Sequence, residues 1–287
     1  MPGEIKVIFF SPKCLEYNLV EHPESPERVR RVYEHLTRRG YHFEEAKLCR
    51  EEDILLVHTS EHFERVKNNQ FFDPDTPNLK NIFQYAMLSV GGALQAAERA
   101  LKGEKSFSLL RPPGHHAGED YLGGFCYFNS IAIATAYVLQ KVDRVAIVDF
   151  DGHHGNGTED IFSGERRVLY LSWHQYPAYP GTGAKSEGNS LNFPLPPGTG
   201  EEEFMKFFLG GLQRVKEFSP SLIAISAGFD AHREETLLSL NLKTRTYFKI
   251  GERIAQFNKP LFAILEGGYH RELPFCVEEF LKGSGIK

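Results

Sequence analysis

The segment DFDGHHGNG combines carboxylates and imidazoles at a spacing that suits metal chemistry. Asp149, Asp151 and His153 are each two residues apart, so an extended chain projects them from one face. They follow the apolar run VAIV, and His154 comes directly after them. Burying this much charge without a counter-charge would cost several kcal/mol. A bound cation removes that cost, so the segment indicates a metal site.

A second apolar run, LIAISAGFD, also ends in a carboxylate, Asp230. Asp151, His153 and Asp230 together offer three ligands and leave positions open for water, which is typical of a catalytic metal centre. Mixed oxygen and nitrogen ligands favour zinc, with iron(II), manganese and cobalt as chemically reasonable alternatives.

A histidine pair lies upstream, in SLLRPPGHHAGED. The preceding Pro-Pro-Gly run holds the backbone in a non-helical turn, which presents His115 and His116 on a loop. Adjacent histidines can transfer protons when neighbouring groups orient and tune them. Asp149 and Asn156 are available as such partners.

Apolar strands that alternate with helices must position these residues. The strands are nearly continuous apolar runs, as expected when helices cover both faces of a parallel sheet. We therefore expect one domain over residues 1–287, with an α/β fold in three layers, α/β/α, and ligands at the carboxyl ends of the strands. The expected strands are 6–10, 107–110, 145–151, 168–173, 222–228 and 261–265, and the expected helices are 26–39, 79–102, 129–141, 201–218, 244–257 and 274–282.

Bulk composition limits the class of protein. The chain has 287 residues and a net charge of -5, which argues against a direct nucleic-acid partner. Its four cysteines lie far apart and form no CxxC pair, a pattern typical of free thiols in a reducing compartment. With no signal-like or membrane-spanning apolar run, we expect a cytoplasmic protein without membrane contact.

Eight segments together resemble the histone deacetylase superfamily, specifically its class II and bacterial deacetylase-like amidohydrolase branch. They occur in the family's order and extend from His22 to Tyr269. The resemblance implies the arginase/deacetylase fold and a zinc-dependent hydrolase that removes acetyl or other short acyl groups from amines. The segments are HPESPERV, DPDTP, RPPGHHAGED, GGFCYFNS, DFDGHHGNGTEDIF, YPGTG, SAGFDAH and LEGGY.

The resemblance also implies roles for individual residues. Asp151, His153 and Asp230 match the zinc ligands. His115 and His116 match the two active-site histidines, with Asp149 and Asn156 as their respective partners. Tyr269 matches the tyrosine that donates a hydrogen bond to the substrate carbonyl. We expect His115 to stay cationic and His116 to protonate the departing amine.

Further matches concern the substrate and a second ion. Phe125 and Tyr179 match the aromatic walls of the acyl-lysine channel, and Gly124 lines it. Asp75 matches the rim aspartate that binds a peptide backbone, and Arg28 matches a buried arginine near the acetate exit. A structural potassium ion is implied at Asp149, Asp151, His153 and Ser172.

The sequence departs from the family after SAGFDAH, where an acidic residue and Pro-Leu-Gly are usual. This chain has Glu235, Thr236 and Leu237 there. Polyamine-selective relatives can carry an acidic residue at the position of Leu237, so leucine favours acyl-lysine of proteins or peptides as the substrate.

Three alternatives stay open at this point. The first is a deacetylase of acetylpolyamines or other small acetylated amines. The second is an arginase-like hydrolase, which would need a bridged two-metal centre with further aspartates. The third is an acyl-lysine-binding module without activity, against which Tyr269 and both histidines argue. The sequence does not indicate an oligomeric state.

Overall fold

The computed structural model describes residues 6–286, and one eight-stranded sheet organises them. Every strand pair is parallel, in the order β2-β1-β3-β8-β7-β4-β5-β6. The α/β fold expected from the sequence is confirmed. The strands are β1 (Lys6–Phe10), β2 (Phe43–Glu45), β3 (Lys105–Ser108), β4 (Val145–Asp149), β5 (Val168–Gln175), β6 (Ser190–Leu195), β7 (Leu222–Ala227) and β8 (Leu261–Leu265).

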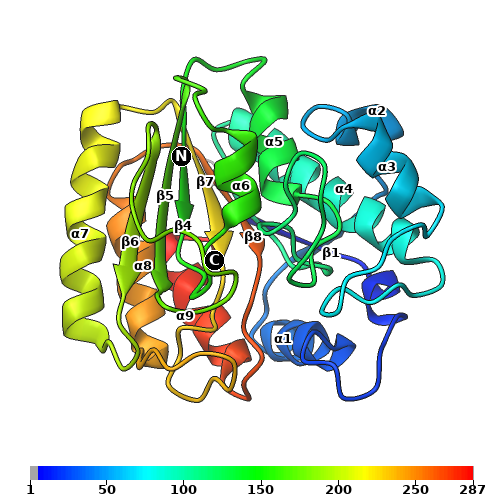
Figure 1. Cartoon of the computed structure of the whole chain (residues 1–287). Helices are drawn as coiled ribbons and strands as arrows, with labels where there is room; N and C mark the ends of the chain where they lie inside the picture. The colour runs from blue at the N-terminus through cyan, green and yellow to red at the C-terminus, as the bar shows by residue number, and fades with distance from the viewer. Residues whose placement is uncertain (1–5, 287) are drawn as a thin grey trace.

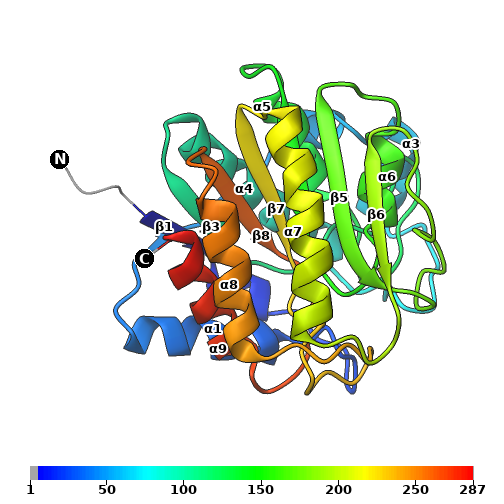
Figure 2. The same cartoon turned by 90° about the vertical axis from the view of Figure 1, so that its left-hand side faces the viewer.

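Helices cover both faces of the sheet (Figures 1 and 2). The α7, α8 and α9 helices lie on one face, where α1 packs against α9, and α4 and α5 lie on the other. The helical elements are η1 (Pro12–Leu15), α1 (Pro26–Arg38), α2 (Glu51–Ile54), α3 (Ser60–Lys67), α4 (Ile82–Leu101), α5 (Ser130–Val138), α6 (Asn156–Ile161), α7 (Glu201–Phe218), α8 (Thr244–Ala255) and α9 (Leu273–Ser284).

The sequence missed the two edge strands, β2 and β6. Both lie at the ends of the sheet and are incompletely buried, so neither is an unbroken apolar run. The β6 strand contains Asn192 and Pro194, and proline is tolerated at a sheet edge. The expected strand 107–110 is also corrected, since β3 begins at Lys105 and ends at Ser108.

Four neighbouring strands, β3, β8, β7 and β4, form the centre of the sheet. Because they are parallel, the segments that follow them emerge at the same edge. The sequence after β3 contains His115, after β8 Tyr269, after β7 Asp230 and after β4 Asp151. The topology therefore gathers the chemically active residues at one end of the sheet.

Two further observations concern the helices and the cysteines. Within residues 6–286, no helix combines the length and apolar character needed to cross a bilayer. All four cysteines are free thiols, three of them buried.

Candidate active site

Asp151, His153 and Asp230 form a buried cluster of potential metal ligands. Their ligand atoms all lie within 4.8 Å of one another. His153 Nδ1 lies 2.6 Å from Asp230 Oδ2 and 3.3 Å from Asp151 Oδ1. Both carboxylates are fully buried. Within the described part of the chain, no lysine or arginine pairs with either of them.

The backbone holds these carboxylates at a fixed separation. Gly267 N–H donates to Asp151 Oδ2 at 2.7 Å, and Gly152 N–H donates to Asp230 Oδ1 at 2.6 Å. A Cβ atom on Gly267 would lie 2.5 Å from Asp230 Oδ2 and 2.6 Å from Asp151 Oδ2. Only glycine at position 267 therefore leaves room for these two carboxylate oxygens.

The electrostatics of the cluster also suit a cation. Burial, followed by the charge of Asp151, raises the pKa of Asp230 to about 7. Burial acts to lower the pKa of His153, but Asp230 and Asp151 outweigh it and raise that pKa to about 10. Two buried carboxylates thus compete for one positive charge. A divalent ion with oxygen and nitrogen ligands fits this cluster.

His115 is paired with a carboxylate. Its Nδ1 lies 3.1 Å from Asp149 Oδ2, which also accepts a hydrogen bond from the Tyr170 hydroxyl at 3.0 Å. Burial alone would lower the pKa of His115. The charges of Asp151 and Asp149 outweigh burial and raise this pKa to about 10. This environment favours the imidazolium form of His115 at neutral pH.

His116 is paired with a neutral amide instead. Its Nδ1 lies 2.8 Å from Asn156 Oδ1, while Asn156 Nδ2 donates to the Tyr121 hydroxyl at 3.2 Å. An amide oxygen only accepts, so the proton of neutral His116 resides on Nδ1 and Nε2 keeps its lone pair. Burial, reinforced by the charge of His115, holds the pKa of His116 well below its usual value. The pKa values of the two adjacent histidines are thus shifted in opposite directions.

Tyr269 is held between charged and aromatic neighbours. The Arg28 guanidinium carbon lies 4.4 Å from its ring centroid, and the Phe125 ring meets it edge-on at 5.7 Å. Burial raises the pKa of Tyr269 well above its usual value, with Arg28 opposing and Asp151 reinforcing this effect. Its hydroxyl is therefore a protonated hydrogen-bond donor.

A cavity of about 210 Å³ connects the cluster to the surface. All five residues predicted to contact substrate line it, as do both histidines and Tyr269. Tyr179 and Leu237 are 44% and 41% exposed, which places them at the mouth. The lining residues are Asp75, Pro113, His115, His116, Gly124, Phe125, Asp151, His153, Tyr179, Leu237, Gly267 and Tyr269.

Gly124 lines this cavity where its backbone closely approaches His116 and Tyr179. Its φ is +54°, and a Cβ atom there would lie 2.5 Å from His116 Cδ2 and 2.9 Å from Tyr179 Cε1. The Tyr179 ring stands edge-on to His116, with centroids 5.1 Å apart. A side chain at position 124 would therefore displace the ring of His116 or of Tyr179, both of which line the cavity.

Ser172, predicted to bind potassium, lies beside the cluster on β5. It is the register partner of Asp149 on β4, and both are fully buried. The Ser172 hydroxyl lies 2.8 Å from His174 Nδ1, and His174 Nε2 lies 3.0 Å from the Gly183 carbonyl oxygen. With the serine proton directed to His174, the lone pairs of the Ser172 oxygen are free to face a cation.

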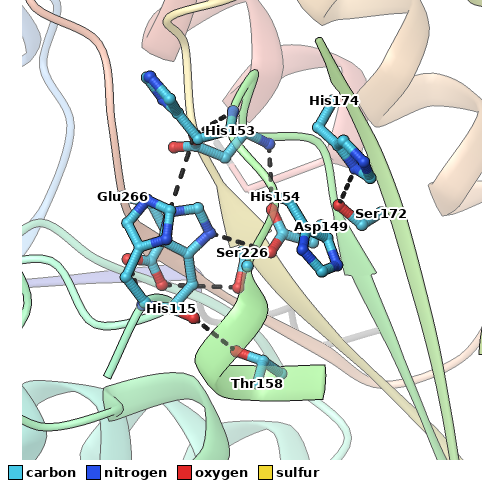
Figure 3. A network of polar contacts seen from close by, with 12 residues as sticks. His115, Asp149, His153, His154, Thr158, Ser172, His174, Ser226 and Glu266 are labelled. Atoms are coloured by element: carbon cyan, nitrogen blue, oxygen red, sulfur yellow. Dashed lines mark hydrogen bonds and ion pairs between the residues drawn. The ribbon is translucent and has the colours of Figure 1, made fainter. Parts of the chain in front are cut away.

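Sequence reasoning missed Glu266, a fully buried residue under the histidine loop (Figure 3). Glu266 Oε2 accepts hydrogen bonds from Gly114 N–H at 2.7 Å and His115 N–H at 3.3 Å. The sequence did contain a signal for Glu266, which is a carboxylate at the end of an apolar run. Glu266 directly follows strand β8, in the same way that Asp149 ends strand β4.

Asn129 was also missed. Its Nδ2 donates to the Ala117 carbonyl at 2.9 Å and to the Thr158 hydroxyl at 3.1 Å, while its Oδ1 caps α5. One side chain thereby fixes the backbone directly after His116 relative to α6. A helix cap is all that sequence would suggest for this asparagine.

A second group of potential ligands, His232, His270 and Cys276, does not suit a metal ion. The two imidazole rings are stacked, with centroids 4.4 Å apart and an angle of 13° between planes. Ring lone pairs lie in the ring plane, so stacked rings do not direct both toward one ion. His232 Nδ1 moreover accepts the Glu234 N–H at 3.2 Å, which leaves the proton of the neutral ring on Nε2.

Comparisons with known proteins agree on one family. The histone deacetylase domain model matches residues 22–283. A "probable deacetylase" of Archaeoglobus fulgidus is 41% identical over 283 residues, covering 88% of this chain and 79% of the relative. "Acetylpolyamine amidohydrolase 1" of Pseudomonas aeruginosa is 40% identical over 211 residues, covering 69% of this chain and 61% of the relative. The crystal structure of the "HDA15 HD domain" superimposes with a TM-score of 0.90 at 31% identity, covering 96% of this chain and 90% of that one.

Proposed function

The chain belongs to the histone deacetylase domain family, and on this premise we propose that it is a zinc-dependent amidohydrolase that deacylates acyl-lysine in proteins or peptides. The observation that carries the proposal is the convergence of three potential ligands, two histidines of different charge and Tyr269 on one cavity. Family membership makes the chain a deacetylase-type hydrolase. The metal, the substrate and the residue roles below belong to the proposal.

Asp151, His153 and Asp230 would hold the zinc ion. Zinc bound there would supply an acidified water and polarise the acyl carbonyl. The ligands' own hydrogen bonds, from Gly267 to Asp151 and from Gly152 to Asp230, orient the oxygens before the ion arrives.

The two histidines divide the proton chemistry. His116 is neutral and keeps a free Nε2 lone pair, so it accepts the proton that water loses on attacking the carbonyl carbon. The same Nε2 then returns that proton to the amine nitrogen as the carbon–nitrogen bond breaks. His115 remains an imidazolium, and its charge opposes the negative charge that builds up on the substrate.

Tyr269 acts on the carbonyl oxygen. Its protonated hydroxyl donates a hydrogen bond that strengthens as the oxygen becomes an oxyanion. Burial keeps the hydroxyl from ionising, so it serves as a donor across the neutral pH range.

The cavity fits a long, thin substrate arm. Phe125, Gly124 and Tyr179 enclose an apolar passage of the kind that an acyl-lysine side chain can fill. Asp75 is exposed at its mouth, where its carboxylate can accept hydrogen bonds from a peptide backbone.

An acetylpolyamine is the second candidate substrate, favoured by the relative named acetylpolyamine amidohydrolase. A polyamine carries a second ammonium group, which needs an anionic partner near the mouth. Leu237 occupies the rim position at which polyamine-selective relatives can carry an acidic residue. The carboxylate of Asp75 at the mouth is assigned to a peptide backbone, so the rim as a whole favours acyl-lysine.

A substrate panel tests the proposal. The kcat/KM for acetyl-lysine peptides should exceed that for N-acetylputrescine, and Leu237→Glu should shift the ratio toward N-acetylputrescine. Metal analysis should find one catalytic zinc per chain, whereas two would support the arginase-like alternative. Loading with iron(II) in place of zinc identifies the preferred metal. A wild-type enzyme that hydrolyses none of these amides would overturn the proposal.

Two secondary assignments stay proposals. Potassium at Asp149, Asp151, His153 and Ser172 is supported by the cross-strand contact of Asp149 with Ser172. A cytoplasmic location is supported by the separated cysteines.

A further inference from the structure

The peptide group that joins Gly268 to Tyr269 is held at both ends by side chains of opposite charge. Arg28 Nε donates to the Gly268 carbonyl oxygen at 2.7 Å. On the other side, Glu235 Oε2 accepts the Tyr269 N–H at 2.8 Å. Because a peptide group is a rigid plane, bonds at both ends fix its orientation. That plane sets the direction in which the Tyr269 side chain leaves the backbone.

Gly268 is the residue at which this plane could otherwise rotate. Its φ is +116°, a region that L side chains rarely adopt. With no side chain on Gly268 to restrict it, the orientation of the next peptide depends on its hydrogen-bond partners. The guanidinium of Arg28 already forms an ion pair with Glu24, with 3.1 Å between Arg28 Nη1 and Glu24 Oε1. Glu235, by contrast, forms no ion pair with any cationic group of residues 6–286.

Glu235 also contacts the rim of the cavity. It is only 9% exposed. Its Oε1 accepts hydrogen bonds from Thr236 N–H at 2.7 Å and, more weakly, from Leu237 N–H at 3.4 Å. The two oxygens of the Glu235 carboxylate therefore bind different parts of the site. Oε1 binds the backbone of the rim, and Oε2 binds the backbone of Tyr269.

The rim loop has further anchors of its own. Ser239 N–H donates to Gln175 Oε1 at 2.7 Å, and Leu242 N–H donates to the Ala231 carbonyl at 3.0 Å. Loss of the Glu235 bond should therefore release the Tyr269 peptide more than it releases the loop.

We propose that Glu235 is a positioning residue that aims the Tyr269 hydroxyl at the substrate carbonyl and links its position to the rim at Leu237. This role rests on the proposed function, since it acts through the Tyr269 donor. A displacement of a catalytic group by about 1 Å can cost around a hundredfold in rate. A residue that fixes the backbone of Tyr269 should thus affect turnover without contacting substrate.

Glu235→Gln is the informative variant. Glutamine has nearly the same shape but only one acceptor oxygen, so its NH₂ group must face an N–H donor at one end. Glu234→Gln is the matched control, because the Glu234 side chain is 58% exposed and lies 3.7 Å from Arg233 on the surface. We expect Glu235→Gln to lower kcat by about ten- to a hundredfold with little change in KM, and Glu234→Gln to match the wild type.

A double-mutant cycle separates positioning from general damage. In a Tyr269→Phe background, Glu235→Gln should cause little further loss, since the hydroxyl it positions is gone. The inference would be overturned if the two fold-losses in kcat multiply in the double variant, or if Glu235→Gln keeps the wild-type kcat. If Glu235→Gln does not fold, Glu235→Asp replaces it, because retreat of the carboxylate by one methylene should weaken the Tyr269 bond.

A readout that does not depend on activity completes the test. In protein labelled with ¹⁵N-tyrosine, the Tyr269 amide resonance is assigned by its loss in Tyr269→Phe. Glu235→Gln should move this amide proton upfield, because a hydrogen bond to a carboxylate is lost, and an unmoved resonance would overturn the inference. If the wild type proves inactive on every amide, the proposed function fails, while this resonance still decides whether Glu235 holds the Tyr269 peptide.

Discussion

His116 directs its Nδ1 at the side-chain oxygen of Asn156, 2.8 Å away, and so has a neutral partner. His115, one residue before it, has the carboxylate of Asp149 at 3.1 Å. The surroundings of the two rings shift their pKa values in opposite directions. Asp151 and Asp149 outweigh burial and raise the pKa of His115 to about 10, whereas burial and the charge of His115 lower that of His116. The contrast makes the pH dependence of the reaction predictable.

Asn156→Asp should move the acid limb of the pH profile to higher pH. A carboxylate beside His116 favours its cation and raises its pKa, typically by about one to three units. Because His116 accepts a proton only when neutral, activity should then appear at a higher pH than in the wild type. The measurement is kcat/KM against pH, with the exposed Asn258→Asp as the control. An unchanged profile would remove His116 from the role of base.

Tyr269→Phe should lower kcat by about a hundredfold or more, the usual effect of removing one oxyanion donor. Metal content and melting temperature should change little, because the ring and its contact with Arg28 remain. Tyr85→Phe is the matched control, since the Tyr85 hydroxyl bonds Glu16 at 3.2 Å away from the cavity. Wild-type turnover in Tyr269→Phe would exclude the tyrosine from the mechanism.

Gly267→Ala should abolish metal binding while leaving every ligand side chain in the sequence. The new methyl group would lie 2.5 Å from Asp230 Oδ2 and 2.6 Å from Asp151 Oδ2, so the two oxygens must separate. Gly210→Ala is the control, because nothing lies within 4 Å of a Cβ atom there. Zinc per chain is measured by mass spectrometry after dialysis, together with the rise in melting temperature that zinc causes. A Gly267→Ala protein with one zinc and a wild-type rise would contradict the assigned geometry.

Glu278→Gln should destabilise the protein at neutral pH but much less in acid. Glu278 on α9 contacts His35 on α1 at 2.7 Å and Arg39, the residue directly after α1, at 2.9 Å. Burial acts to raise its pKa, but the hydrogen bonds from His35, Arg39 and Lys282 outweigh burial and lower it from 4.5 to about 2. A carboxyl whose folded-state pKa is depressed stabilises the fold above its unfolded pKa, and this contribution disappears as the pH falls toward the folded value.

The corresponding measurement is the melting temperature of wild type and Glu278→Gln between pH 7 and pH 2. The difference should be largest at pH 7 and should shrink between about pH 4.5 and 2. Glu27→Gln serves as the control, since the Glu27 pair with Arg30 is 55% exposed on the glutamate side and should contribute little. A difference that is constant with pH would show that the Glu278 charge is not the source of the stability.

The central strands were predictable because they are buried on both faces. The β4, β7 and β8 strands are buried at every position, and such runs are visible in the sequence as unbroken apolar stretches. The β6 strand alternates buried and half-buried positions and contains Pro194, so the same criterion missed it. Edge strands are specified by the neighbour that they pair with, which is a tertiary property.

The cluster of ligands was predictable for a related reason. Charged residues at the ends of apolar strands have no packing role, and parallel strands bring their carboxyl ends together. Asp151 and Asp230 are visible in this way, although 79 positions separate them and their proximity depends on β4 pairing with β7. Glu266 shows the same signal, but only its contact with the histidine loop reveals what it holds.

The sequence by itself determined which chemical groups this protein has and that they stand at strand ends, because local residue types decide both. The tertiary structure decided the pKa and the orientation of each group. Whether a histidine is cationic depends on its burial and on the charges around it, and Asp149 reaches His115 across 34 positions of the chain. The orientation of Tyr269 depends on Arg28, 240 positions from the carbonyl that it binds. Such contacts form only when distant segments fold against each other, so no local pattern encodes them.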